Sequence, residues 1–243
     1  MPKIWVCAAT RSESEGARLG VRRSGLEGWF EFLRTGMGPA RAARSLIARL
    51  AATEPRNRPD KIISTGFAGS WSPALRVGEW IEALAICDES ENPIEPVPES
   101  GLAQPALLCS VGTIHAAPMR ALLEKIQGTS KIGLPVAVDM ESFGLARIAR
   151  ESGIAFSVIR YVTDSADRPL PDFIRHTTRA LAPEAEDHVP DRMRAAANGA
   201  LSLLRQPSDV AALLRDGFRW RRELIEGWAR FAERLTEFYS KPS

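Results

Sequence analysis

The sequence predicts an α/β fold, because segments with the pattern of short buried strands alternate with helical segments along most of the chain. The clearest unit spans residues 138–162. Its helical apolar face ends at Gly153, and residues 154–162 follow as a buried strand rich in β-branched side chains. Two strands joined through a helix in this way are expected to lie parallel. The length of 243 residues is ample for one large domain with a two-faced core.

The first part of the chain contains two predicted strands, at residues 4–9 and 29–34. The segment between them is predicted to be rich in turns because of its glycines, which are Gly16, Gly20, Gly25 and Gly28. A glycine loop at residues 35–39 then leads into a helix that begins at Pro39, where the first helical position tolerates proline.

The middle of the chain contains short strands and tight turns. Residues 61–65 form a short predicted strand that runs into a second glycine loop, residues 66–69, and residues 77–87 form the next strand. Residues 89–105 are rich in proline and are predicted to be a surface loop before a strand at 106–111. A helix is predicted at residues 119–126.

The pattern is helical from Pro169 to the end of the chain, which predicts a main domain at residues 1–185 and a helical extension at 186–243. An amphipathic stripe recurs at spacings of four and three, through Leu224, Trp228, Phe231, Leu235 and Phe238. We expect this helix to pack on its own domain or against a second subunit of a homo-oligomer. The alternative is a helix on a membrane surface, because aromatic residues adjoin four arginines, which are Arg215, Arg219, Arg221 and Arg222.

The composition argues against several classes of partner. The net charge is +2 with mixed signs and no basic block, so nucleic acid is not expected. The three widely spaced cysteines indicate a reducing compartment and buried thiols, and they are Cys7, Cys87 and Cys109. The three histidines have no metal-ligand spacing, so no metal is expected. Without a signal peptide or an apolar run of spanning length, the expected location is the cytoplasm.

Carboxylates follow two of the predicted strands, at the rim where α/β proteins bind ligands. Glu141 begins a helix, where it serves either to complement the helix dipole or as an acceptor for a vicinal diol, and Met140 beside it offers an apolar floor for a ribose. Asp164 is either a turn residue or, with a raised pKa in a sheltered pocket, a general acid. Asp139 and Thr163 adjoin these two residues and are assigned to the same site.

The glycine loops and an acidic pair complete the candidate site. Glycines let backbone N–H groups approach an anion or a sugar, although tight turns alone are an equal explanation. Anion binding is assigned to the first loop, and substrate binding to the second; the residues are Gly36, Gly38 and Arg41, and then Phe67, Ala68 and Gly69. The first loop lacks the third glycine of a dinucleotide fingerprint, so no NAD is expected. Glu13 and Glu15 follow the first strand, where either is a candidate base.

Three motifs in this order resemble the purine nucleoside phosphorylase and nucleosidase superfamily, which includes the methylthioadenosine/S-adenosylhomocysteine nucleosidases. They are residues 35–38, residues 63–69 with 75–79, and residues 138–141 paired with 163–164. The resemblance covers most of residues 3–168 and implies a three-layer α/β/α sandwich around a mixed, mostly parallel sheet. It also implies that Glu141 binds the ribose hydroxyls, that Met140 packs on the sugar, and that Asp164 protonates the purine at N7.

A longer set of segments is similar to the hopanoid-associated nucleoside phosphorylases, and it comprises residues 138–142, Arg160, Asp164, 166–168, 170–171, 201–207 and 212–215. This similarity implies release of adenine from adenosylhopane, a lipid-linked adenosine. Inorganic phosphate would be the acceptor, with no cofactor. An apolar 5′ substituent would fit a C-terminal helix in peripheral contact with a membrane.

Two departures leave the acceptor open. Ser64 and Phe67 stand where bacterial hexameric phosphorylases place phosphate-binding residues, although Arg11, Arg41 or Arg160 could replace the missing ligand. Hydrolytic members use a glutamate after the first strand to activate water, and an ungapped overlay places Glu13 there, with Glu15 as the fallback.

His115 lies near the loop that lines the base in related nucleosidases, where it either stacks on a purine or starts a surface helix.

Taken together, the motifs and the resemblance predict a phosphorylase that cleaves a purine nucleoside. Its alternatives are a nucleosidase that uses water activated by Glu13, and a protein that binds a nucleoside or lipid without turnover.

Overall fold

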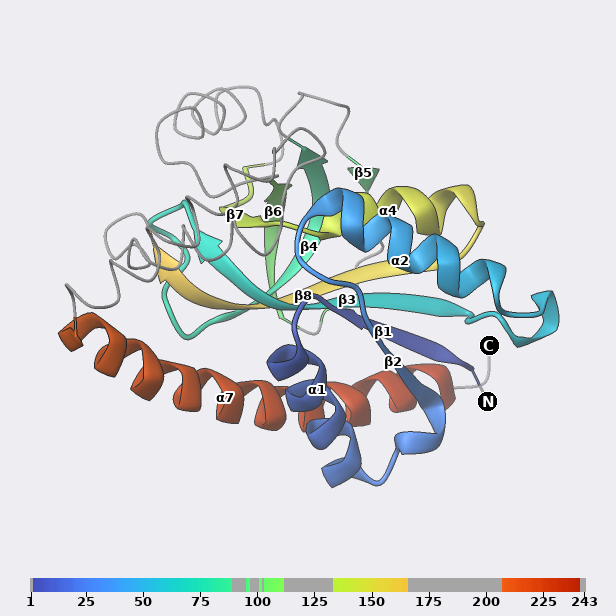
Figure 1. Ribbon diagram of the computed structural model, residues 1–243, viewed down its shortest axis with the longest axis horizontal. Coiled ribbons are helices and arrows are strands. Elements are labelled where there is room, and N and C mark those ends of the chain that lie inside the picture. The colour runs from blue at the N-terminus through green and yellow to red at the C-terminus, as the bar shows by residue number, and fades with distance from the viewer. Residues whose placement is uncertain are drawn as a thin grey trace.

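The computed structural model describes residues 2–88, 95–96, 101, 103–111, 133–165 and 207–240. A central sheet is covered by α2 and α4 on one face and by α1 and α7 on the other, which is the predicted three-layer α/β/α arrangement (Figure 1). The described elements are β1 (Ile4–Ala8), α1 (Arg11–Ser24), a 3₁₀ turn η1 (Glu27–Trp29), β2 (Phe30–Arg34), α2 (Pro39–Ala51), a 3₁₀ turn η2 (Pro55–Asn57), β3 (Lys61–Ser70), β4 (Trp80–Asp88), β5 (Glu95–Pro96), β6 (Gln104–Ser110), β7 (Val136–Asp139), α4 (Ser142–Glu151), β8 (Ala155–Ser165) and α7 (Pro207–Ser240).

The described strands form one mixed sheet in the order β2-β1-β3-β7-β6-β4-β5, and β8 pairs with both β3 and β4. The pairs β1–β2, β1–β3, β3–β8, β4–β6 and β6–β7 are parallel, and the other three are antiparallel. The pairings β3-β7-β6-β4-β8-β3 close a ring, so one end of the sheet is barrel-like.

The prediction that the strands on either side of α4 lie parallel is wrong. β8 is parallel to β3, whereas β7 is antiparallel to it and pairs with its last two residues, Gly69 and Ser70. β7 is parallel to β6, and β6 is parallel to β4. These three strands form the half of the ring that is antiparallel to β3 and β8. The helix α4 therefore crosses from one half of the ring to the other, which a rule for open parallel sheets does not describe.

The predicted turn-rich segment is largely the helix α1. Thr10 caps it and forms a capping box with Glu13, and Gly25 ends it with a φ of 72°. Its internal glycines bring α1 close to α7: a Cβ added at Gly20 would lie 2.5 Å from Trp228 Cβ, and one at Gly16 would lie 3.1 Å from Leu224 Cβ. These two glycines serve helix packing and not turns.

The second glycine loop is also not a loop, because β3 continues through it to Ser70. The long strand β8 pairs with β3 along this whole length. The pairing shifts register between Ala68 and Gly69, within the glycine segment. The first glycine loop precedes α2 as predicted, and β4 begins at Trp80, three residues later than expected. The helix expected at 119–126 and most of the expected loop at 89–105 lie outside the described residues.

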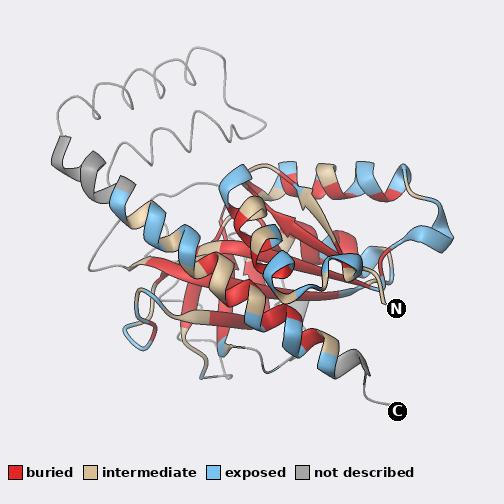
Figure 2. Ribbon diagram, turned by 90° about the horizontal axis from the view of Figure 1, so that it is seen from below, coloured by how far each residue is buried: buried red, intermediate tan, exposed pale blue. Residues whose placement is uncertain are grey.

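The C-terminal helix α7 packs on its own domain. Its buried side chains Leu224, Trp228, Phe231 and Leu235 form one core cluster with β1, β3 and α1, and Figure 2 shows buried and exposed residues along α7 from the outside. The three cysteines are buried and free, as expected. Among the described helices, none has the length and apolar character needed to cross a membrane.

Candidate active site

The site is built at the ends of β7 and β8, where the sequence places its carboxylates. Asp139 is the last residue of β7, and its carboxylate accepts hydrogen bonds from Ser110 Oγ, from Ser142 N and Oγ, and from the Arg160 guanidinium. The ion pair with Arg160 is buried on both sides. Asp139 was predicted to bind substrate, but in the structure its carboxylate binds and orients Arg160.

Glu141 occupies the N-cap position of α4, although its side chain makes no capping hydrogen bond, and it is 7% exposed. Its Oε1 accepts the Gly38 N–H at 3.0 Å, and its Oε2 lies 4.0 Å from Arg160 Nη2. Burial, followed by the neighbouring Asp139 carboxylate, raises the pKa of Glu141 to about 8. The carboxyl is thus held at the sheet rim with a proton that it loses as the pH rises through about 8.

The first glycine loop binds a carboxylate of the protein itself. The Gly38 N–H donates to Glu141, and the Gly36 N–H donates to the Ala9 carbonyl at 3.1 Å. A Cβ at Gly36 would lie 2.3 Å from Arg41 Cδ, so the arginine side chain packs over the glycine. Both N–H groups predicted to bind an anion are therefore engaged within the protein.

Glu13 faces the site and Glu15 does not. The Glu13 Oε2 accepts from Thr10 N and Oγ1, and its Oε1 accepts the Phe67 N–H at 3.0 Å. Glu15 instead forms an ion pair of 2.7 Å with Arg11 on the outside of α1. Of the two candidate bases, only Glu13 is placed to act, and Arg11 is not a candidate phosphate ligand.

Gly66 makes room for two charged groups. Its φ is 141°, and a Cβ there would lie 2.2 Å from Glu13 Oε1 and 3.4 Å from Arg160 Nη1. Any side chain at this position would displace the glutamate or the arginine. Gly66 therefore allows the Glu13 carboxylate and the Arg160 guanidinium to approach the same point of β3.

Arg160 is 2% exposed, and one of its nitrogens lacks a hydrogen-bond partner among the described residues. Nε and Nη2 donate to Asp139, Ser64 and Ser142, whereas Nη1 has no hydrogen-bond partner among the described residues. Burial alone would lower the pKa of Arg160, but the surrounding carboxylates outweigh burial and raise it. A buried, charged and unpaired N–H beside Glu13 indicates a place for a ligand oxygen.

Asp164 lies on β8, and in the part of the chain that the structure describes its side chain has only a neutral donor. Its Oδ1 accepts from Thr163 Oγ1 at 2.8 Å, and a Cβ at Gly69 would lie 2.8 Å from its Oδ2. The Thr163 hydroxyl also lies 3.4 Å from the Ala68 carbonyl. Burial raises the pKa of Asp164, and the hydrogen bond from Thr163 opposes this only in part. The glycine of β3 thus leaves space for a carboxyl that retains a proton more readily than a free aspartate.

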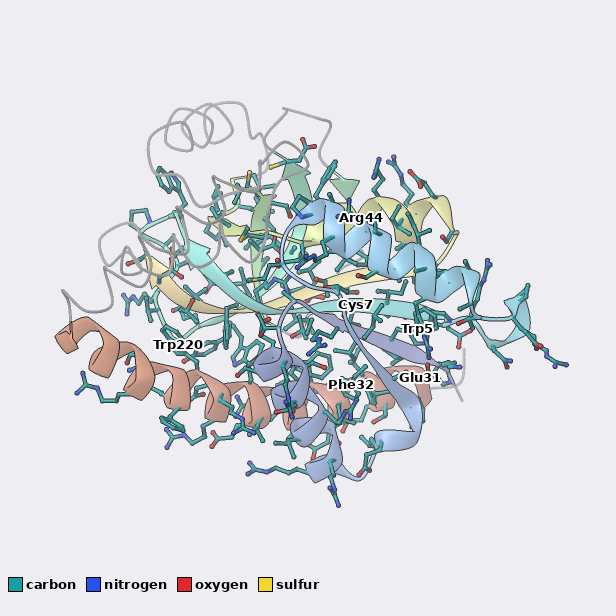
Figure 3. All side chains as sticks on the ribbon, viewed as in Figure 1. Trp5, Cys7, Glu31, Phe32, Arg44 and Trp220 are labelled. Carbon is teal, nitrogen blue, oxygen red and sulfur yellow. The ribbon has the colours of Figure 1, made fainter. Side chains whose placement is uncertain are left out.

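The remaining predicted residues lie as follows. The Phe67 ring packs on Trp220 of α7 with centroids 5.8 Å apart, so Phe67 faces the site through its backbone. Trp220 is labelled on α7 in Figure 3. Met140 is partly buried against an apolar cluster of β4, β6 and β7. His115 lies outside the described residues. Within the described part of the chain, no three potential ligands are placed to hold a metal ion.

Sequence reasoning missed the groups that hold the charged side chains in place. Ser110 and Ser142 orient Asp139, Thr10 orients Glu13, and the Trp228 indole donates to Thr65 on β3. The spacing of Thr10 and Glu13 was a readable signal, because it is that of a capping box before a helix. Ser110 gave no local signal, because it meets Asp139 only when β6 pairs with β7, whereas Ser142 lies just three residues after Asp139.

No protein-family model matches the chain. It is 27% identical over 177 residues to the futalosine hydrolase of Streptomyces coelicolor, a match that covers 62% of this chain and 74% of that protein.

Solved structures resemble the fold over most of the chain. The apo 5′-methylthioadenosine nucleosidase of Arabidopsis thaliana matches with a TM-score of 0.63 and 11% identity, covering 100% of this chain and 98% of that one. A variant of the Helicobacter pylori MTAN with 5′-methylthioadenosine in its active site gives 0.56 and 12%, covering 98% of both chains. A futalosine hydrolase variant of Helicobacter pylori gives 0.55 and 15%, covering 82% of this chain and 99% of that one. The chain therefore has the fold that the methylthioadenosine and futalosine nucleosidases share.

Proposed function

We propose that the protein is a purine nucleosidase that hydrolyses the N-glycosidic bond, with Glu13 as the base that activates water. The observation that carries this proposal is the buried Glu13 carboxylate beside the unpaired Arg160 Nη1. A water between them would donate a proton to the carboxylate and accept a hydrogen bond from the guanidinium. The names of the similar proteins, which are nucleosidases and hydrolases, support the same reaction type.

The other two carboxyls take distinct roles. Glu141 would form hydrogen bonds with the ribose hydroxyls, and Asp164 would give its proton to the purine as the C–N bond breaks. Glu13 takes the proton of the attacking water while the new C–O bond forms at the anomeric carbon. The products are the free base and the free sugar, and no cofactor is consumed.

Electrostatics favour water over phosphate as the acceptor. Three carboxyls, Glu13, Asp139 and Glu141, surround one described guanidinium, that of Arg160, which Asp139 already neutralises. A phosphate dianion would meet the charge of Glu13 in a buried environment, where like charges repel strongly. Neutral water carries no such cost.

The test is base release from adenosine, methylthioadenosine and futalosine, measured with and without inorganic phosphate. Hydrolysis predicts release that is independent of phosphate, and Glu13→Gln is expected to lower kcat by roughly 10²- to 10³-fold. Glu15→Gln is the matched control on the same helix and should retain full activity. Release that requires phosphate would establish phosphorolysis and remove Glu13 from the role of base.

A lipid-linked adenosine, as in adenosylhopane, is the second candidate substrate, and one surface observation favours it. Phe218 is 73% exposed on α7 and adjoins the exposed side chains of Arg219, Arg221 and Arg222. An exposed aromatic ring among arginines suits the surface of an anionic membrane. Faster turnover of an adenosine with a long apolar 5′ extension, and binding to anionic vesicles that Phe218→Ser weakens, would support this candidate.

A further inference from the structure

Trp228 joins three elements at one point. It is fully buried on α7, and its indole Nε1 donates to Thr65 Oγ1 on β3 at 2.9 Å. On the α1 side, its Cβ lies against Gly20, where an added Cβ would be 2.5 Å away. The same side chain therefore contacts the helix that carries Glu13 and the strand that holds the Glu13 carboxylate.

The position of Glu13 depends on how α1 and β3 lie relative to each other. Thr10 in the cap of α1 holds one carboxylate oxygen, and the Phe67 N–H on β3 holds the other. Thr65 and Phe67 lie on either side of Gly66, the residue that both Glu13 and Arg160 approach. A small slide of α1 along β3 would break one of the two anchors.

The helix α7 contacts this short piece of β3 at both ends. Trp228 binds Thr65 through its indole N–H, and Trp220, two turns earlier on α7, packs on the Phe67 ring. The backbone of Phe67 cannot move toward α7 while Trp220 fills that space. The strand is thus supported from behind at the residues that frame the carboxylate.

We propose that Trp228 is a positioning residue that fixes the proposed base Glu13 by tying α1 to β3 through its hydrogen bond to Thr65. The inference rests on the proposed function, because it assigns Trp228 to the same reaction. Trp228 itself does not touch the substrate. Its effect should fall on kcat and not on nucleoside binding, because Glu13 acts on the water.

The experiment compares Trp228→Phe, which keeps an aromatic ring but loses the N–H, with Thr65→Val, which keeps the shape but loses the hydroxyl. Each is expected to lower kcat about 10-fold, since small misplacements of a catalytic group are costly. KM should change less than about 2-fold, and the double variant should resemble either single variant because both remove the same hydrogen bond.

The decisive control removes Glu13. In the Glu13→Gln background, Trp228→Phe should leave the residual rate unchanged, because its effect acts through the missing carboxylate. Leu235→Ala, a buried change on the same helix, should lower Tm but leave kcat unchanged. Thr65→Val serves alone if Trp228→Phe does not fold.

Two outcomes would overturn the inference. One is a Thr65→Val or Trp228→Phe protein with a lower Tm but a wild-type kcat. The other is an equal loss of rate with and without Glu13. A wild-type protein that releases no base would instead overturn the proposed function, and the inference with it.

Discussion

The two sides of the candidate site are built in different ways. On the side where the attacking water is proposed to bind, Asp139 and Arg160 form a buried ion pair. Glu13, Glu141 and hydroxyl donors surround this pair. On the side where the purine is proposed to bind, Asp164 has among the described residues only the neutral Thr163 hydroxyl to oppose its burial. The dense network fixes the Asp139–Arg160 pair in position, whereas burial beside a single neutral donor raises the pKa of Asp164. In the proposed mechanism, one carboxyl therefore serves as the base and another as the acid according to its neighbours.

The largest effect is expected from Arg160→Met, which leaves Asp139 buried and unpaired. The free energy of unfolding should fall by about 3–5 kcal/mol, because an uncompensated buried charge is costly. Urea unfolding monitored by tryptophan fluorescence measures it. The double variant with Asp139→Asn should recover part of this loss. If the double variant instead lost as much stability as the two single variants together, the Asp139–Arg160 ion pair would not organise this side of the site.

On the other side, Asp164→Asn removes the proton donor but retains the side-chain size. We expect kcat to fall by roughly 10²- to 10⁴-fold, with ligand binding largely retained through Glu141. Base release and calorimetric titration of a non-cleavable nucleoside measure the two properties. Because the pKa of Asp164 is raised, wild-type activity should persist above the ordinary range for aspartate and decline as pH rises through that pKa. Full activity in the variant would show that another group protonates the base.

Glu141→Gln tests the acceptor side through stability. The folded state raises the pKa of Glu141 from 4.5 to about 8, so the folded protein binds the proton more tightly than the unfolded chain. The resulting stability is fully present below pH 4.5 and is lost as pH rises toward 8. Between pH 5 and 8.5 the wild type should lose on the order of 4 kcal/mol relative to Glu141→Gln in urea unfolding. Parallel pH curves for the two proteins would contradict the raised pKa.

The smallest effect is expected from Thr163→Val, which removes the neutral hydrogen bond to Asp164. Stability should fall by only about 1 kcal/mol. The pKa of Asp164 should rise further, because the threonine hydroxyl lowers it, and the basic limb of the activity profile should move to higher pH. A shift to lower pH would mean that Thr163 stabilises the protonated acid instead.

Much of the fold follows from local pattern. The apolar β-branched segments predicted the strands β1, β2 and β8 to within a few residues, and Pro39 marked the start of α2. The glycines misled, because the sequence does not show what each one approaches. Gly16 and Gly20 lie against another helix, and Gly66 and Gly69 lie inside a strand against Glu13 and Asp164.

The sequence by itself determined most of the strands, the helices α2, α4 and α7, and the placement of Glu141 and Asp164 at the ends of predicted strands, because periodicity and capping are local properties of a chain. It also offered two glutamates, Glu13 and Glu15, as candidates for the base. Only the tertiary structure placed Glu13 toward the site and Glu15 away from it, left Arg160 Nη1 without a partner among the described residues, and engaged the first glycine loop with Glu141. Those outcomes depend on contacts between residues up to 103 positions apart, as for Gly38 and Glu141, and only the closed sheet and its covering helices bring such residues together.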